Sequence, residues 1–111
     1  MEQETAIEAF AALAQSSRMT IYRLLVQAGP DGFQAGEIAR RLGIVPSTLS
    51  GHMAILKRAG LVKSKRHQRE IHYSADLGAM NELVGFMLAD CCSGQVENCS
   101  EILTLLGPPA G

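Results

Sequence analysis

The three cysteines of the chain, Cys91, Cys92 and Cys99, fall within nine consecutive positions. Trivalent arsenic or antimony forms three bonds to sulfur in a pyramid whose fourth direction holds a lone pair, so three thiolates complete its shell. Adjacent residues on a helix point about 100° apart, and Gly94 supplies the break that lets the vicinal pair face one ion. Cys99 then begins a new helix, whose dipole favours a thiolate. The cluster predicts a site for As(III) or Sb(III).

Other thiol chemistries fit the same residues. Zinc usually takes four ligands, and the fourth would have to be Asp90, Glu97 or a histidine from a distant part of the chain. Cadmium, lead and mercury also favour thiolates. One cysteine of the vicinal pair could instead form a disulfide with Cys99 and sense oxidants. Residue types alone leave these soft-metal and redox alternatives open.

The sequence shows no enzyme signature beside the cysteines. It has no Gly-rich phosphate loop, no Cys-x-x-Cys motif and no evident set of nucleophile, base and orienting group,. No apolar stretch approaches the roughly 18 residues of a membrane helix, and the acidic N-terminus lacks the basic region of a signal peptide. We therefore expect a cytoplasmic protein that is not an enzyme, has no organic cofactor and has no membrane partner.

Positive charge is concentrated in one part of the chain. The formal net charge is −1, yet residues 40 to 69 carry +8 and the remainder carries −9. A segregated basic segment is typical of a polyanion-binding protein. A solvated basic surface without a ligand is the alternative. The eight basic residues of the segment are Arg40, Arg41, Lys57, Arg58, Lys63, Lys65, Arg66 and Arg69.

Two short helices precede and enter this basic segment. Apolar spacing predicts a helix at about 35 to 42 that ends at Gly43. Pro46 suits the first position of the next helix, in which Leu49, Met53 and Leu56 form a buried stripe and which Gly60 closes,. Two short helices joined by a turn that contains glycine are typical of a helix-turn-helix.

The second of these helices offers small polar residues for contact with DNA. Hydroxyl groups near a helix N-terminus can approach bases and phosphates in the major groove. Gly51 costs about 1 kcal/mol of helix propensity, which either a close approach to DNA or a tight helix crossing inside the protein would explain. His52 is more often a hydrogen-bonded packing residue than a base reader. The predicted DNA-binding residues are Ser47, Thr48, Ser50, Gly51, His52, Lys57, Arg58, Lys63, Lys65, Arg66 and Arg69.

The remaining pattern completes one small domain. We expect helices at about 4 to 14, from an N-cap at Ser16 or Ser17, from Asp76 to about residue 90, and from Asn98. Alternation over 61 to 65 and 70 to 74 predicts a two-stranded wing. The fold class is mainly α with a small β-hairpin, in the order α-α-α-α-β-β-α-α, paired into a homodimer. The domain covers residues 1–106, and 107–111 form a flexible tail.

Residues 10 to 75 resemble the ArsR/SmtB family of metalloregulatory repressors. The similar stretches are 13–18, 37–43, 46–56 and 60–62, which read LAQSSR, EIARRLG, PSTLSGHMAIL and GLV. The resemblance implies a homodimer, joined by its first and late helices, that binds double-stranded operator DNA until an inducer releases it. The vicinal cysteines with a third nearby also resemble a C-terminal, arsenite-responsive type within the family.

The chain departs from the family pattern at two places. Gln68 stands where the wing tip usually carries glycine. The best-known arsenic site of the family uses cysteines in the first helix of the helix-turn-helix, and residues 33 to 43 contain none here. A sensor in this chain must therefore lie elsewhere, which again favours Cys91, Cys92 and Cys99.

Overall fold

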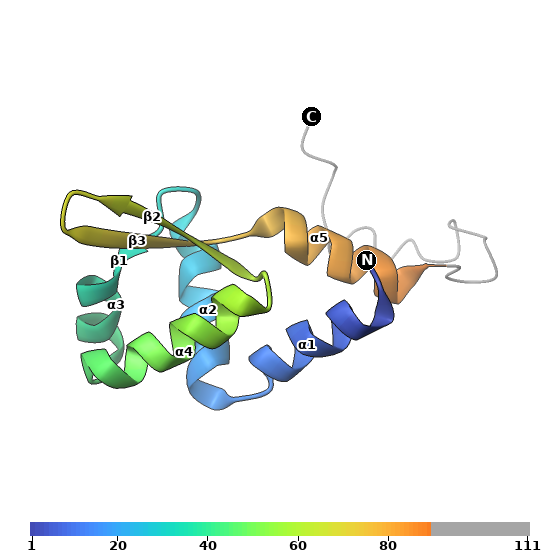
Figure 1. Ribbon diagram of the computed structural model, residues 1–111, viewed down its shortest axis with the longest axis horizontal. Coiled ribbons are helices and arrows are strands. Elements are labelled where there is room, and N and C mark those ends of the chain that lie inside the picture. Colours follow the sequence, from blue (N-terminus) through green and yellow to red (C-terminus); the bar gives the residue numbers. More distant parts are fainter. Residues whose placement is uncertain (90–111) are drawn as a thin grey trace.

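A computed structural model describes residues 1–89 of the chain. A small antiparallel sheet lies at one edge of the molecule beside the helices (Figure 1), which confirms the mainly α class with a β-hairpin. The elements in chain order are α1 (Gln3–Leu13), α2 (Ser16–Ala28), β1 (Phe33–Gln34), α3 (Ala35–Leu42), α4 (Pro46–Arg58), β2 (Val62–His67), β3 (Glu70–Ala75) and α5 (Leu77–Leu88).

The α3–α4 turn forms as the sequence predicts. Gly43 ends α3 in the left-handed region, with φ 65°, and the N–H of the next residue, Ile44, donates to the carbonyl of Ala39 at 3.0 Å. Pro46 occupies the first turn of α4, where its missing N–H leaves no helical hydrogen bond unmade. A left-handed glycine followed by a proline stops one helix and starts the next within a few residues.

The caps of two other helices differ in how well they were predicted. Asp76 caps α5 as expected, because its side chain accepts from the N–H of Ala79 at 3.0 Å. The predicted cap of α2 at Ser16 or Ser17 is wrong, since both serines already lie in the helix. The extended residue before them is Gln15, whose Oε1 accepts from the N–H of Arg18 at 2.8 Å. Its longer side chain replaces a serine cap.

The wing is part of a three-stranded sheet in the order β1-β3-β2. Its two long strands pair from Val62 opposite Ala75 to His67 opposite Glu70. The short β1 was not predicted, because two residues show no periodicity. It depends on Gly32, which has φ +62° and at which a Cβ atom would lie 1.8 Å from the carbonyl oxygen of Tyr73. Glycine is therefore required where the chain enters β1.

The wing turn is tighter than its residues suggest. The strands extend to His67 and Glu70 and leave only two residues at the tip. Gln68 has φ 59°, in the left-handed region that glycine usually occupies. The chain thus forms the turn without the usual glycine, at the cost of placing a side chain on a left-handed residue.

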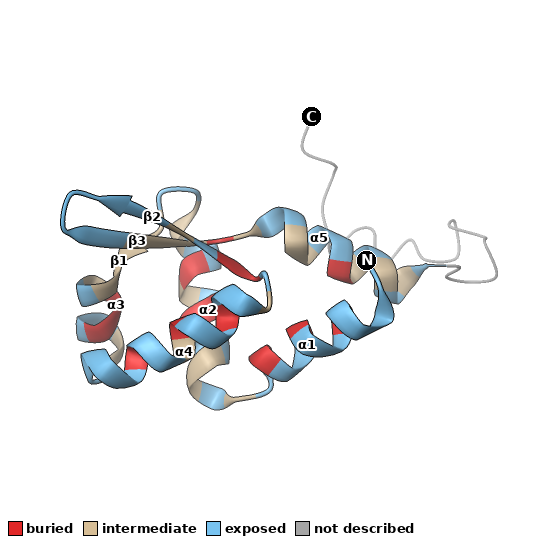
Figure 2. Ribbon diagram, in the orientation of Figure 1, coloured by how far each residue is buried: buried red, intermediate tan, exposed pale blue. Residues whose placement is uncertain are grey.

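The core lies between α1, α2, α3, α4 and the base of the wing (Figure 2). The predicted stripe of α4, made of Leu49, Met53 and Leu56, is buried. Helix α1 packs against α2, α4 and α5 through small side chains. The largest fully buried side chains are Ile21, Leu25, Ile38, Leu49, Met53, Leu56 and Leu61.

Several predictions concern residues beyond the described part. The helix from Asn98, the boundary of the domain at 106, the tail and all three cysteines lie outside residues 1–89. Within the described part, none of the helices combines the length and apolarity needed to cross a membrane.

Candidate nucleic-acid interface

The outward face of α4 carries the small residues predicted to contact DNA. Ser47, Thr48, Ser50 and Gly51 are all exposed. Ser47, Gly51 and Arg58 fall on one helical stripe by their spacing, on the side opposite the buried Leu49, Met53 and Leu56,. The sequence order therefore places small groups at the N-terminal half of an exposed helix face and a guanidinium at its end.

The structure decides between the two explanations for Gly51. A Cβ atom built at this position meets no described atom within 4 Å. A tight helix crossing inside the described protein is therefore not the reason for glycine here. Close approach of a ligand to the outward face of α4 remains as an explanation.

The end of α4 is fastened to the wing by a predicted phosphate contact. The Nζ of Lys57 donates to Oγ of Ser64 on β2 at 2.6 Å. Lys57 remains exposed, and its ammonium has further protons to donate. The bond therefore joins the end of α4 to β2 and leaves positive charge at their junction.

The predicted basic residues of the wing divide between its two faces. Side chains alternate along a strand, so Lys63 and Lys65 lie on one face of β2, and Ser64 and Arg66 lie on the other. Arg66 also donates from Nε to the carbonyl of Gln68 at the tip, at 3.3 Å. Arg66 therefore shares the face that is bound to α4, and Arg69 is exposed at the tip. Lys63 and Lys65 face the opposite way.

The two arginines of α3 are engaged by a neighbouring carboxylate. Glu37 bridges Arg40 at 2.5 Å and Arg41 at 2.8 Å. Hydrogen bonds from Arg40 and then Arg41 lower the pKa of Glu37 below its ordinary value. The guanidinium of Arg41 also lies 4.4 Å from the centroid of the Phe33 ring. These pairs reduce the share of the basic segment that is available to a polyanion.

His52 joins α4 to the junction of α1 and α2. Its Nδ1 lies 3.4 Å from a terminal nitrogen of Arg18, whose Nε donates to the carbonyl of Ala12 at 2.6 Å. The ring is half-buried, which agrees with a hydrogen-bonded packing residue. Sequence reasoning missed Arg18, because its partner lies 34 positions away and a single sequence carries no signal of that pairing.

No group of three His, Cys, Asp or Glu side chains suited to a metal ion forms within residues 1–89. His67 and His72 do lie near one another on the wing, with ring centroids 6.3 Å apart. The predicted ligands Cys91, Cys92 and Cys99 lie outside the described residues, so their role stays a prediction.

The comparisons with known proteins agree with this geometry. A family model described as a helix-turn-helix domain matches residues 13–65. The uncharacterized HTH-type transcriptional regulator YbzH of Bacillus subtilis is 32% identical and is aligned over 73% of this chain and 93% of its own length. A solved ArsR-like transcriptional regulator from Rhodococcus is 25% identical, with 92% of each chain covered and a TM-score of 0.67. The chain belongs to the HTH-type transcriptional regulators.

A second solved structure with a similar fold is a homodimer. It is the homodimeric winged helix-turn-helix DNA-binding domain of Mb0332 from Mycobacterium bovis, which is 26% identical with a TM-score of 0.62. The match covers 78% of this chain and 81% of that one. As an HTH-type transcriptional regulator, the chain belongs with transcription factors and not with enzymes. The family alone does not specify an inducer.

Proposed function

We propose that this chain is a dimeric repressor that binds operator DNA through α4 and the wing and releases it when As(III) or Sb(III) binds Cys91, Cys92 and Cys99. The observation that carries the DNA-binding part is the exposed face of α4, where small polar residues are followed by Lys57 and Arg58. Direct readout uses such a helix in the major groove, whereas phosphate contacts hold it in place.

The wing extends the proposed DNA-binding surface of α4. Ser64, Lys57 and Arg66 lie on the side of the hairpin that α4 contacts. A hairpin beside a recognition helix extends the contact along the duplex backbone. When its basic side chains neutralise phosphates there, condensed counterions are released. Affinity therefore comes mainly from the arginines and lysines, and sequence choice comes mainly from the N-terminal half of α4.

Exposed apolar side chains on α1 and α5 support a homodimer. These two helices contact one another, and a second subunit would cover residues that are otherwise in water. The homodimeric relative Mb0332 has the same fold. The exposed apolar residues are Ile7 and Phe10 on α1, and Leu77 and Met87 on α5.

The inducer is proposed from the donor set in the sequence. Three thiols within nine positions match the three bonds of a trivalent metalloid. The cysteines follow α5 in the sequence. Helix α5 contacts α1, and α1 contacts α4. A change in conformation caused by ion binding at the cysteines can therefore reach the DNA-reading helix through these packed helices. Reversing a 99:1 population takes about 5.5 kcal/mol of differential affinity, which three sulfur bonds per subunit can supply.

A release assay tests the whole proposal. An operator duplex is first selected from a random pool with the full-length reduced chain, and arsenite is then added in a mobility-shift experiment. We expect arsenite to free the duplex, and each of Cys91→Ser, Cys92→Ser and Cys99→Ser to bind the duplex but to remain bound in arsenite. Failure to select any duplex at low ionic strength contradicts the DNA-binding part.

Three other outcomes would point away from a metalloid sensor. Release by all three serine variants would exclude the thiol sensor. Release by peroxide that a reductant reverses, in the absence of metal, would assign the cysteines to redox sensing. Release by zinc, cadmium or lead but not by arsenite would assign them to another soft metal. Charge-transfer absorption during the titration counts the ions bound per chain.

A further inference from the structure

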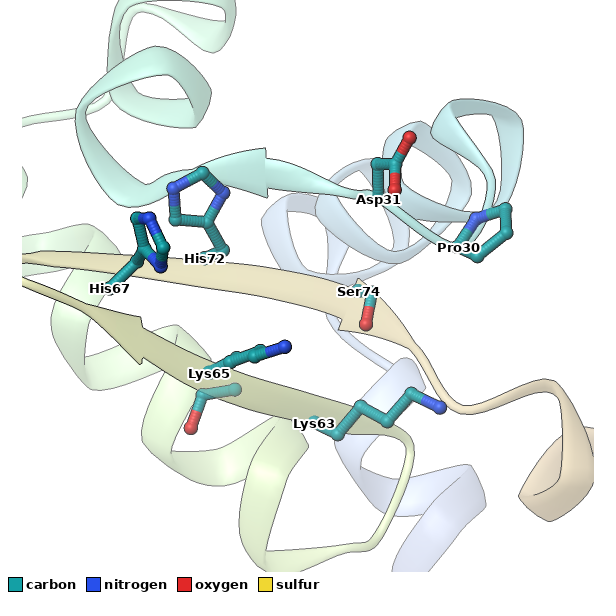
Figure 3. A pocket seen from close by; sticks show the side chains of 8 residues that line it. Pro30, Asp31, Lys63, Lys65, His67, His72 and Ser74 are labelled. Atoms are coloured by element: carbon teal, nitrogen blue, oxygen red, sulfur yellow. The ribbon is translucent and has the colours of Figure 1, made fainter.

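A hollow of about 650 Å³ lies on the outer face of the wing (Figure 3). The two imidazoles are grouped at one end of it, and Lys63 lies at the other end near the turn that holds Asp31. Lys65 lies between them. The lining residues are Pro30, Asp31, Lys63, Ser64, Lys65, His67, His72 and Ser74.

The register of the hairpin explains why these groups converge. Lys63 pairs with Ser74, and Lys65 pairs with His72, so directly opposed residues place their side chains on the same face. His67 follows two residues after Lys65 and therefore shares that face. Two strands thus bring ammonium, imidazole and hydroxyl donors to one concave surface.

The charge of this surface favours an anion. Two lysine ammonium groups face the single carboxylate of Asp31 in the lining. A second carboxylate, Glu70, lies 3.9 Å from Nε2 of His72 and accepts a hydrogen bond from Gln34. The hydrogen bond from Gln34 thus holds Glu70 at the tip end, near the His72 ring. The middle of the hollow, around Lys65 and Ser74, is left to cationic and hydroxyl groups.

This surface is separate from the proposed operator-reading surface. The hydroxyl of Ser64 is bound to Lys57 on α4, so the opposite face of β2, which bears Lys63 and Lys65, points away from α4. DNA readout by α4 therefore does not account for the grouping of Lys63, Lys65, His67 and His72. A ligand of its own would explain why the two strands direct their donors there.

We propose that the outer-wing hollow is a binding site for a phosphate group. A phosphate offers several oxygen acceptors in a small volume and pairs with lysine as a point charge, which suits donors that converge from two strands. The phosphate can come from a small phosphorylated molecule or from the backbone of DNA that flanks the operator. The site goes beyond the repressor function, because free phosphate can occupy it whether or not the chain recognises an operator.

Histidine NMR resonances test the site directly. The full-length reduced protein is titrated with inorganic phosphate at constant pH, with sodium chloride of equal ionic strength as the control salt. We expect saturable shifts of the His67 and His72 ring protons in the millimolar range. His52 lies on α4 outside the lining and serves as the internal control. Equal shifts of all three histidines, or none, would overturn a site for free phosphate.

Paired variants assign the effect to the hollow. The exposed pair Lys63→Gln and Lys65→Gln should weaken phosphate binding about tenfold, whereas Arg23→Gln on α2 with Arg58→Gln on α4, both outside the lining, should leave it unchanged. Both pairs remove the same charge, so equal losses would reduce the effect to general electrostatics and overturn the site.

A parallel titration with the selected operator duplex distinguishes the two sources of phosphate. If inorganic phosphate leaves His67 and His72 unmoved while the selected operator duplex shifts both through Lys63 and Lys65, the ligand is the DNA backbone. If phosphate shifts them and the duplex does not, the ligand is a small molecule. If neither shifts them, the proposal is wrong, even where the duplex still binds and the repressor function holds.

Discussion

At the scale of single residues, Gly51 shows most directly how stability and function compete on α4. Glycine in the middle of a helix is unfavourable relative to alanine, and the described structure leaves open space where its Cβ would be. The residue therefore weakens the helix without any gain in internal packing. Its place on the outward stripe with Ser47 and Arg58 suggests that the gain occurs when DNA is bound.

Gly51→Ala should separate these two effects. We expect the variant to raise the free energy of unfolding by about 1 kcal/mol and to weaken operator binding, because a methyl group separates the helix from the duplex. Gly36→Ala is the matched control, since Gly36 is also exposed, helical and free of described neighbours within 4 Å. It should stabilise the protein without changing DNA affinity. Urea denaturation measures the stability of each variant, and mobility shifts measure its affinity for DNA. An equal change in DNA affinity for Gly51→Ala and Gly36→Ala would refute the prediction.

Gln68 is a second residue at which the side chain and the backbone conflict. Its φ of 59° places a side chain in the left-handed region, which costs roughly 1 kcal/mol. Gln68→Gly should relieve this strain and stabilise the wing. The neighbouring Arg69 has no positive φ, so Arg69→Gly should destabilise it by about 0.5–1 kcal/mol. Urea midpoints of the two variants should shift in opposite directions, and shifts in the same direction would contradict the strain.

At the scale of elements, the contact between Arg18, His52 and Ala12 links three helices. Arg18 belongs to α2, its Nε is bound to the end of α1, and its terminal nitrogen lies beside His52 on α4. Helix α1 also contacts α5, which leads toward the cysteines. The three residues therefore form a fixed point between the proposed dimer helices and the DNA-reading helix.

Substitutions at Arg18 and His52 should reveal this link as an energetic coupling. We expect Arg18→Gln to lower the free energy of unfolding by about 1 kcal/mol. In the double variant Arg18→Gln with His52→Gln, the loss of unfolding free energy should be smaller than the sum of the two single losses by about 0.5 kcal/mol or more. Arg23→Gln, on an exposed position of the same helix, should stay within about 0.5 kcal/mol. Strict additivity in the double-mutant cycle would show that the two side chains act independently.

The acidic residue of α3 gives a prediction about pH. The pKa of Glu37 is lowered in the folded state by hydrogen bonds from Arg40 and Arg41. Its stabilising contribution is therefore present above its ordinary value of 4.5 and is lost as pH falls through the lowered folded value. Glu37→Gln should flatten this acid limb of the stability profile, measured by urea denaturation at several pH values. An unchanged acid limb would contradict the ion pairs.

Local sequence signals account for the elements that could be predicted. Gly43, Pro46 and the stripe through Leu49 determine the α3–α4 turn through backbone conformation and 3.6-residue spacing, and all of these act within a few positions. The short β1 and the partners of Arg18 depend on contacts between distant segments, which one sequence does not encode visibly. The placement of Lys63 and Lys65 on one face of the wing and of Arg66 on the other follows from the period of two, once the strands are known to reach His67 and Glu70.

At the scale of the whole molecule, charge and apolar surface are segregated. The basic segment from 40 to 69 supplies α4 and the wing, whereas exposed apolar residues lie on α1 and α5. A dimer joined through α1 and α5 would keep both DNA surfaces free. A protein with a net charge of −1 can then bind a polyanion, because the field at the contact depends on nearby charge and not on the sum.

The salt dependence of operator binding should count the contacts made by this assembly. Each phosphate contact contributes about 0.9 to the slope of log affinity against log salt concentration. Arg58 ends the outward stripe of α4 and is exposed, so Arg58→Gln should reduce the slope by about 2 in a dimer, through one contact per subunit. Arg23→Gln removes the same charge from an exposed position on α2 and should leave the slope unchanged. Binding isotherms at several salt concentrations measure both variants. A loss of only about 0.9 would indicate one subunit per operator, and equal losses for the two variants would mean that overall charge, and not the α4 surface, drives binding.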